Sequence, residues 1–206
     1  GMTIGLGTGS TAYWAIQKLG ERVAQGLRIR AIGTSKKTED LARAVNIPLV
    51  TFAEVKTLDL DIDGADEVSA CYALTKGGGG ALLREKLVAS AARRFIVIVD
   101  QQKMVDRLGK FLLPVEVVPF AWELTQTRVE AAGCRSIRRQ TATNEPFVTD
   151  NGNYILDCDF GRIDDPKTLH ETLIHIPGLV ETGLFVDMAA VIVVSDGKDV
   201  QVQTIR

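Results

Sequence analysis

The sequence has few cysteines, few aromatic residues and no excess of positive charge, and these shortages exclude several classes of protein. Three cysteines, Cys71, Cys134 and Cys158, are far apart and form no CxxC pair, so we expect reduced thiols and a cytoplasmic location. Lys and Arg number 24 against 26 Asp and Glu, a formal net charge of −2. No basic stripe interleaves with aromatic residues, so nucleic acid is not an expected partner.

Long apolar runs are also missing. The longest runs, such as residues 188–194, have seven residues or fewer, whereas a helix needs about 20 to span a bilayer. The sequence has no basic segment followed by an apolar one, so nothing in it suggests secretion. We therefore expect no membrane partner. The two histidines, His170 and His175, are five residues apart. This spacing does not place them on one helix face, and we do not expect them to bind a metal.

The first half of the chain alternates apolar strands with helices. We predict strands at residues 3–6, 29–33, 58–62 and 95–99, and helices at 12–25, 37–45 and 81–93. Strands that are apolar throughout are typical of a parallel sheet that is buried on both sides. The fold class predicted is therefore α/β, with a Rossmann-like, mostly parallel sheet and helices on both faces.

The pattern changes near residue 113. We predict strands at 115–118, 134–139, 147–149, 154–159 and 179–185, with helices at 121–132 and 166–175. An Asn151-Gly152 turn indicates a hairpin, and the order of elements suggests a small ferredoxin-like α+β unit. The β-rich residues 189–194 and 200–205 return to the first domain. The expected domains are 1–112 with 187–206, Rossmann-like and catalytic, and 113–186, ferredoxin-like and used for oligomerisation.

A glycine-rich loop, residues 5–11, joins the first strand to the first helix. Glycine lets the backbone turn tightly, and the hydroxyls of Ser10 and Thr11 with the helix N-terminus can donate hydrogen bonds to an anion. The loop is not a dinucleotide fingerprint, because Ser10 stands where that motif requires glycine, and it lacks the lysine of a nucleotide P-loop. A purely structural tight turn remains the alternative.

Acidic residues cluster where the third strand ends. Asp59, Asp61 and Asp63 resemble the start of a calcium loop, but Ala70 occupies the twelfth position, where a glutamate is required. We therefore expect no metal. Ligands bind at the carboxyl ends of strands in open α/β sheets, so Asp63 and Asp66 are candidates for holding sugar hydroxyls.

The alternative for these two acids is turn formation and helix capping. Glu67, which follows Asp66 directly, is predicted to be a solvated neighbour.

Lys76 precedes four consecutive glycines and a predicted helix. Four glycines cost conformational entropy on folding, so close approach of the backbone to a ligand explains them better than a linker does. Glu85 lies on the helix that follows, where a carboxylate can accept and return a proton. Its alternative is an exposed surface glutamate. Lys103, after the strand at 95–99, can reach a phosphate or be an ordinary surface lysine.

Taken together, these segments resemble ribose-5-phosphate isomerase of the A type. The matching motifs, in order along nearly the whole chain, are residues 7–11, 34–35, 63–67, 76–79 with 84–86, 109–111 leading to 114–119, 149–153 and 176–179. The sequence departs from the family pattern at Gln102, where serine is common, and it starts almost at the first strand, where the family usually has a preceding helix.

The resemblance implies an aldose–ketose isomerase that interconverts ribose 5-phosphate and ribulose 5-phosphate without a metal or an organic cofactor. It implies that Glu85 accepts the proton, with Asp63, Asp66 and Lys76 around the reacting end of the sugar. Members are homodimers or homotetramers. The expected substrate-binding residues are Thr8, Gly9, Ser10, Thr11, Asp63, Gly64, Ala65, Asp66, Lys76, Gly77, Gly78, Gly79 and Lys103.

Two other functions compete with this one. A sugar-phosphate sensor without catalysis would use the same kind of fold, but such regulators usually carry a DNA-reading helical module, which this sequence lacks. A nucleotide-dependent oxidoreductase is disfavoured by the failed dinucleotide fingerprint.

Overall fold

A computed structural model describes residues 1–205, and the chain divides into two compact units. The first comprises Gly1–Ala65, Arg84–Gln102 and the segment from Met188 onward, and the second comprises Asp66–Leu83 and Lys103–Asp187. The second unit thus also takes in residues 66–83, 103–112 and 187, which were predicted to belong to the first domain.

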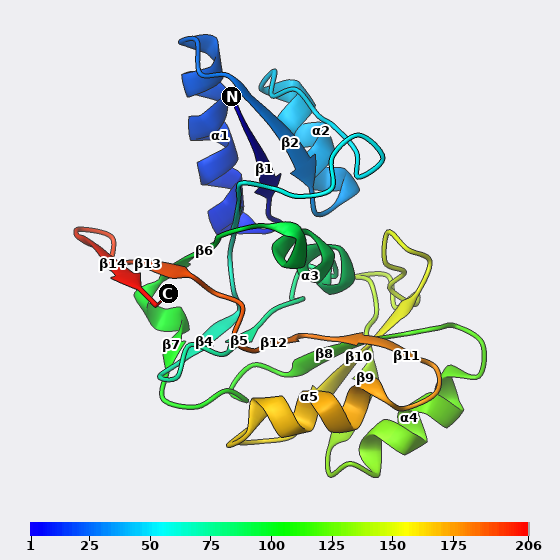
Figure 1. The fold of residues 1–206 in the computed structure, drawn as a ribbon. Helices are drawn as coiled ribbons and strands as arrows, with labels where there is room; N and C mark the ends of the chain where they lie inside the picture. Colours follow the sequence, from blue (N-terminus) through cyan, green and yellow to red (C-terminus); the bar gives the residue numbers. More distant parts are fainter. Residues whose placement is uncertain (206) are drawn as a thin grey trace. The chain divides into compact units, whose positions relative to one another are not determined.

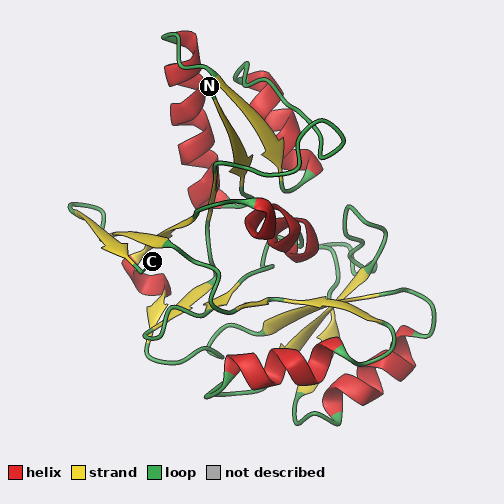
Figure 2. Cartoon of the chain, viewed as in Figure 1, coloured by secondary structure: helices red, strands yellow, loops and turns green. Residues whose placement is uncertain are grey.

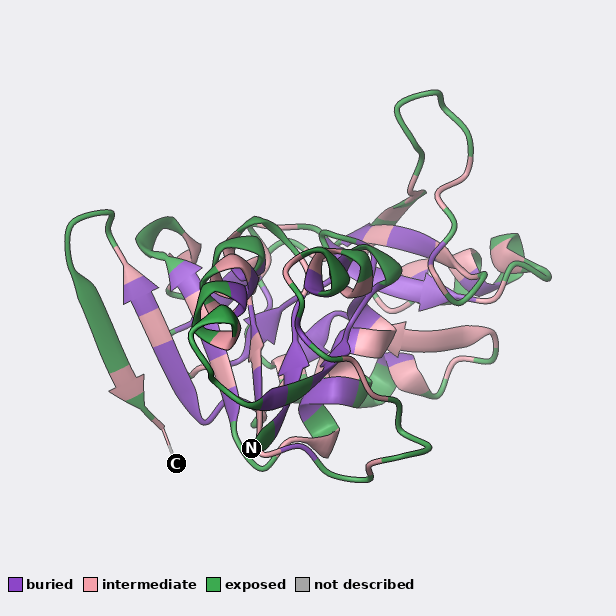
Figure 3. Cartoon of the chain, turned by 90° about the horizontal axis from the view of Figure 1, so that it is seen from above, coloured by how far each residue is buried: buried purple, intermediate pink, exposed green. Residues whose placement is uncertain are grey.

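The first unit is built on a six-stranded sheet (Figure 1). Its strand order is β14-β13-β6-β3-β1-β2, and all neighbours are parallel except β13 and β14. This confirms the Rossmann-like, mostly parallel sheet. The strands are β1 (Met2–Leu6), β2 (Ile29–Gly33), β3 (Leu60–Asp63), β6 (Phe95–Asp100), β13 (Val191–Ser195) and β14 (Val200–Thr204). The edge strand β14 is largely exposed (Figure 3).

Helices cover both faces of this sheet. Ile4 and Leu6 of β1 pack with Ile16 of α1 (Ser10–Ala24), in a cluster that also includes α2 (Lys36–Ala44). Gly5 lies between them and points to the opposite face, because side chains alternate along a strand. There, a Cβ on Gly5 would be 2.4 Å from Val88 of α3 (Leu82–Ala91). The small residue lets α3 approach the sheet closely.

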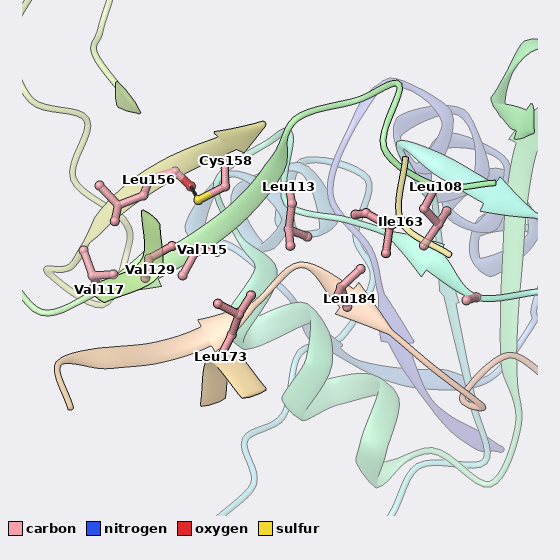
Figure 4. Close-up of a cluster of buried hydrophobic side chains, with 11 residues drawn as sticks. Leu108, Leu113, Val115, Val117, Val129, Leu156, Cys158, Ile163, Leu173 and Leu184 are labelled. Atoms are coloured by element: carbon pink, nitrogen blue, oxygen red, sulfur yellow. Dashed lines mark hydrogen bonds between the residues drawn. The ribbon is translucent and has the colours of Figure 1, made fainter. Parts of the chain in front are cut away.

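The second unit contains a four-stranded antiparallel sheet with two helices (Figure 2). The chain runs β8 (Leu113–Val117), α4 (Trp122–Glu130), β9 (Arg135–Arg138), β10 (Tyr154–Asp159), α5 (Pro166–Ile174) and β11 (Leu179–Thr182). The strand order β11-β8-β10-β9 is that of a ferredoxin-like fold, as predicted. Figure 4 shows its core, in which Val115 and Val117 of β8 lie with Val129 of α4 and Leu156 of β10.

A further small sheet in the second unit was not predicted. Its order is β12 (Leu184–Phe185), β5 (Leu74–Thr75), β4 (Glu67–Ser69) and β7 (Met104–Val105), and a short 3-10 helix, η1 (Gln101–Lys103), precedes β7. The single strand predicted for 179–185 is divided into β11 and β12 at Gly183. A Cβ there would lie 2.3 Å from the carbonyl oxygen of Lys76, so the chain turns where another backbone segment crosses it.

The strand predicted at residues 147–149 is wrong. β9 pairs directly with β10, and the hairpin connection between them spans residues 139–153. The Thr149 hydroxyl donates to Glu116 Oε1 over 2.9 Å, and the side-chain amides of Asn151 and Asn153 donate to the same oxygen. Side-chain hydrogen bonds to a buried carboxylate therefore hold this segment in place of a strand ladder.

Candidate active site

The loop between β1 and α1 is tied to Asp63 at the end of β3. Oδ1 of Asp63 accepts hydrogen bonds from the backbone N–H of Thr8, at 3.0 Å, and of Gly64, at 2.7 Å. Asp63 is fully buried. The structure therefore brings three of the predicted site residues together within the first unit, and one oxygen of the carboxylate is used to orient the loop.

The hydroxyl of Thr8 faces the protein interior. It lies 2.8 Å from Thr34 Oγ1, 2.9 Å from Ser35 Oγ and 3.1 Å from Thr38 Oγ1. Thr38 in turn donates to the carbonyl oxygen of Gly7 at 2.9 Å. This cluster of hydroxyls fixes the loop against the start of α2. We did not predict a role for Thr38 from the sequence. Its position three residues after Ser35, which caps α2, is nevertheless typical of the first turn of a helix.

The N-terminus of α1 remains open to an anion. Gly9 occupies the cap position with φ 118°, no side chain caps the helix, and its first turn contains no acidic residue. The N–H groups of such a turn favour a bound anion. Ser10 is exposed and Thr11 half-buried. A cavity of about 530 Å³ is lined by Thr11, Asp100, Gln101 and other residues of the first unit.

Glu85 lies in the first turn of α3 and is only 3% exposed. The alternative of an exposed surface glutamate is therefore wrong. Ala81 and Ala89, four residues on either side, are also buried. Carboxylates are rarely this buried in proteins unless they are paired or functional, which keeps Glu85 as the candidate base.

Lys76 follows β5 in the second unit and is 2% exposed. Its backbone N–H donates to the carbonyl oxygen of Gly183 at 2.8 Å. Its ammonium group lies 5.4 Å from the centre of the Phe185 ring, within the range of a cation–π interaction. The side chain is thus held by the core of its own unit and is not an ordinary surface lysine.

Asp66 anchors the glycine-rich loop that follows Lys76. Its Oδ2 accepts a hydrogen bond of 2.7 Å from the backbone N–H of Gly78. Gly77 and Gly80 have φ of 105° and 79°, a region that side-chain-bearing residues rarely adopt. The loop conformation therefore requires glycine at these two positions. Gly78 and Gly79 are exposed, which leaves the middle of the loop accessible.

The prediction that Glu67 is a solvated neighbour is wrong. Glu67 is 3% exposed, and its carboxylate accepts hydrogen bonds of 2.9 Å from the N–H groups of both Gly109 and Phe111. Thr75 Oγ1 also donates to it, at 3.3 Å. Glu67 therefore organises the turn at 109–111 from within the second unit.

The remaining predicted residues lie at the junctions between elements. Gly64 and Ala65 join β3 to β4, and both are half-buried. Lys103 ends η1 and is also half-buried. Residues 1–205 contain no group of three or more His, Cys, Asp or Glu side chains placed to hold a metal ion. No helix in that range combines the length and apolar character needed to cross a membrane.

Comparison with known proteins supports one family. Residues 30–199 match the model of the ribose 5-phosphate isomerase A (phosphoriboisomerase A) family. Ribose-5-phosphate isomerase A of Bacillus anthracis is 56% identical over 202 residues, which cover 98% of this chain and 91% of that protein.

Two solved structures agree with this match. Ribose 5-phosphate isomerase A of Methanocaldococcus jannaschii superposes with a TM-score of 0.94 at 41% identity, covering 99% of this chain and 91% of the other. A D-ribose-5-phosphate isomerase in complex with phospho-erythronic acid gives a TM-score of 0.95 at 39% identity, covering 98% and 90%. The resemblance in the sequence motifs is confirmed, and the chain belongs to the ribose 5-phosphate isomerase A family.

Proposed function

We propose that this chain is an aldose–ketose isomerase that interconverts ribose 5-phosphate and ribulose 5-phosphate in the non-oxidative branch of the pentose phosphate pathway. The observation that carries the proposal is 56% identity, over 98% of the chain, to a ribose-5-phosphate isomerase A. A relative of 39% identity binds phospho-erythronic acid. That compound joins a phosphate to a carboxylate, whose spread negative charge resembles that of an enediolate.

The proposed reaction is acid–base proton transfer through a cis-enediolate. Asp63 moves the proton between the ring oxygen and the anomeric hydroxyl when the sugar ring opens. Glu85, ionised, removes the proton from C2 of the open aldose and returns it to C1, while the hydroxyl proton passes from O2 to O1. A positioned acid or base of this kind contributes about 10²–10⁴-fold to the rate.

Stabilisation of the enediolate falls to Lys76 and backbone N–H groups. Negative charge develops on the former carbonyl oxygen, and a buried, preorganised cation interacts with it more strongly than a solvated one does. The burial of Lys76 at 2% exposure supports this role. Asp66 would act at the same end of the sugar, both through its carboxylate and by its hydrogen bond to Gly78.

We assign substrate binding to the backbone of residues 9–11, 64–65 and 77–79, together with hydroxyl side chains and Lys103. The open N-terminus of α1 at Gly9, with Ser10 and Thr11, suits the phosphate, to which Lys103 adds a positive charge. The Thr8 hydroxyl and N–H are occupied inside the protein, so its contribution would be to shape this loop. The backbone of residues 64–65 and 77–79 would contact the sugar. No metal or organic cofactor takes part in the proposed chemistry.

The chain is further proposed to be a cytoplasmic homodimer or homotetramer. Phe120, Leu124 and Ile137 of the second unit are exposed by 88%, 52% and 68%. Exposed apolar side chains of this size are characteristic of protein interfaces, which supports oligomerisation through the ferredoxin-like unit. The cysteines Cys71, Cys134 and Cys158 are free thiols, as suits a reducing compartment.

The test is to incubate the purified protein with ribose 5-phosphate and excess EDTA, without nucleotide, and to measure ketose formation. Ketose under these conditions is expected. Binding of ribose 5-phosphate without conversion would identify a sensor instead, and conversion only in the presence of NAD or NADP would identify an oxidoreductase. The same assay with glucose 6-phosphate measures the tolerance for other aldose phosphates.

A further inference from the structure

Arg139, which follows β9, holds two carbonyl groups of the glycine-rich loop. Its Nη1 donates to the carbonyl oxygen of Gly77 at 2.9 Å and to that of Gly78 at 3.2 Å. All three residues belong to the second unit, although Arg139 and Gly77 are 62 positions apart. The Arg139 side chain is 15% exposed. An arginine enclosed to this degree and directed at a glycine loop is more than a solubilising surface charge.

Asp157 of β10 fixes the direction of this guanidinium. Arg139 Nε lies 2.9 Å from Asp157 Oδ2, and Nη2 lies 2.5 Å from Oδ1. Such a two-point pairing holds the planar fork in one orientation, which a single lysine ammonium cannot reproduce. The pairing occupies Nε and Nη2, so that Nη1 is the nitrogen that reaches the loop. The carboxylate and the loop therefore bind opposite ends of one rigid group.

The two hydrogen bonds determine which way the loop N–H groups point. In a trans peptide the C=O and the following N–H are directed to opposite sides. With the Gly77 carbonyl on Arg139, the N–H of Gly78 points away, where Asp66 accepts it at 2.7 Å. With the Gly78 carbonyl also on Arg139, the N–H of Gly79 points away as well. Gly79 is an exposed residue, and within residues 1–205 its N–H donates no hydrogen bond to the protein, so it is available to a ligand.

Phe147 supports the far end of the loop. A Cβ on Gly80 would be 2.4 Å from the Phe147 ring, so the ring packs directly on the loop backbone. The guanidinium carbon of Arg139 lies 5.8 Å from the centre of the same ring. Arg139 thus lies next to both the loop and the Phe147 ring that packs on it.

We propose that Arg139 and Asp157 are positioning residues for the isomerisation: together they orient residues 77–79 so that the Gly79 N–H is presented to the substrate. This inference rests on the proposed function, in which the same loop contacts the sugar. Neither side chain touches the reacting atoms. Their effect is to hold a donor in place before the substrate arrives, and misplacing such a group by about 1 Å can cost on the order of 10²-fold in rate.

The test compares Arg139→Gln, Arg139→Lys and Asp157→Asn with the wild type. Each variant is expected to keep its circular dichroism spectrum and to lose about 10-fold to 100-fold in kcat, with a smaller change in KM. The double variant Arg139→Gln/Asp157→Asn should lose no more kcat than Arg139→Gln alone, because both changes act on the same interaction that orients the loop. The matched control is Arg138→Gln. The guanidinium carbon of Arg138 lies 4.3 Å from the centre of the Trp122 ring. In the described chain the hydrogen bonds to the carbonyls of Gly77 and Gly78 come from Arg139 and not from Arg138.

A second readout does not require catalysis. Hydrogen exchange of the Gly78 amide, followed by NMR, should be slow in the wild type and in Arg138→Gln and faster in Arg139→Gln and Asp157→Asn. The positioning role is overturned if the Arg139 variants have the same kcat, KM and Gly78 exchange rate as a wild type that isomerises ribose 5-phosphate. The proposed function stands in that case. If the wild type is inactive, the function fails, and an unchanged Gly78 exchange rate in Arg139→Gln still overturns the orientation of the loop by Arg139.

Discussion

Gly7 and Asp63 approach so closely that no side chain fits between them. A Cβ on Gly7 would lie 1.9 Å from Asp63 Oδ1 and 2.6 Å from Asp63 Cα. The same Oδ1 accepts the N–H of Thr8. The loop at the start of α1 and the carboxylate at the end of β3 therefore hold one another, and the geometry of one depends on the other.

Replacing Gly7 with alanine should destabilise the protein. The neighbouring atoms include backbone, which cannot rotate away as the end of a flexible side chain can, and such overpacking typically costs about 1–3 kcal/mol. The midpoint of urea unfolding measures the effect. Gly64→Ala is the matched control, since its Cβ would meet only the carbonyl oxygen of Ile98, at 3.7 Å. A Gly7→Ala midpoint equal to that of the wild type would show that the loop moves freely relative to Asp63.

The parallel sheet could be predicted because its signal is local. β2 occupies residues 29–33, as predicted, and β6 extends the predicted strand by one residue, to Asp100. β6 is apolar from Phe95 to Val99, and β2 is apolar except for the exposed Arg30, so the length of each strand can be predicted without knowing its neighbours. The ferredoxin-like order of elements could be predicted for the same reason.

The environment of single acids could not be predicted in this way. Asp66 and Glu67 are adjacent, yet Asp66 holds the N–H of Gly78, whereas Glu67 holds those of Gly109 and Phe111. The partners of Glu67 lie 42 and 44 positions away, and such long-range hydrogen bonds leave no pattern around the acid itself. A buried carboxylate therefore looks like a solvated one until the chain is folded.

Glu85→Gln is expected to remove most turnover while leaving substrate affinity nearly unchanged. The amide keeps the size of the side chain but cannot accept a proton from C2, so kcat should fall by about 10²–10⁴-fold. Glu123→Gln is the control, because Glu123 also lies in the first turn of a helix but is exposed. Steady-state kinetics with ribose 5-phosphate provides kcat and KM for both. Near-normal turnover in Glu85→Gln would assign the base to another residue.

Phe120→Ser should weaken self-association. The Phe120 side chain is 88% exposed, and burying it in an interface would stabilise an oligomer through the hydrophobic effect. Sedimentation velocity at a series of concentrations should show dissociation of the variant at concentrations where the wild type remains associated. Trp14→Ser removes a 71% exposed aromatic residue of the first unit and should have no such effect. The opposite outcome, with Trp14→Ser dissociating and Phe120→Ser associated, would place the interface on the Rossmann-like unit.

Asp165 should stabilise α5 in a manner that depends on pH. The backbone N–H of Thr168 and then its hydroxyl donate to the Asp165 carboxylate, at 3.0 and 2.7 Å, and these bonds lower the pKa of Asp165 below its usual value. Because the pKa is lower in the folded state, the unfolded chain binds the proton more readily. The stabilisation is therefore fully present above the unfolded pKa of about 3.9 and is lost as pH falls through the folded pKa.

The test is thermal unfolding of the wild type, Asp165→Ala and Asp165→Asn between pH 7 and pH 3, a range that includes the unfolded pKa of Asp165 of about 3.9. It separates the effect of the Asp165 charge from the effect of helix capping. Asn retains a side-chain oxygen that can cap the helix but does not ionise. The difference in Tm between the wild type and Asp165→Asn should be largest at neutral pH and should shrink in acid. The difference between Asp165→Asn and Asp165→Ala should stay constant across the range. A gap between the wild type and Asp165→Asn that is equally large at both ends would mean that ionisation of Asp165 does not support the helix.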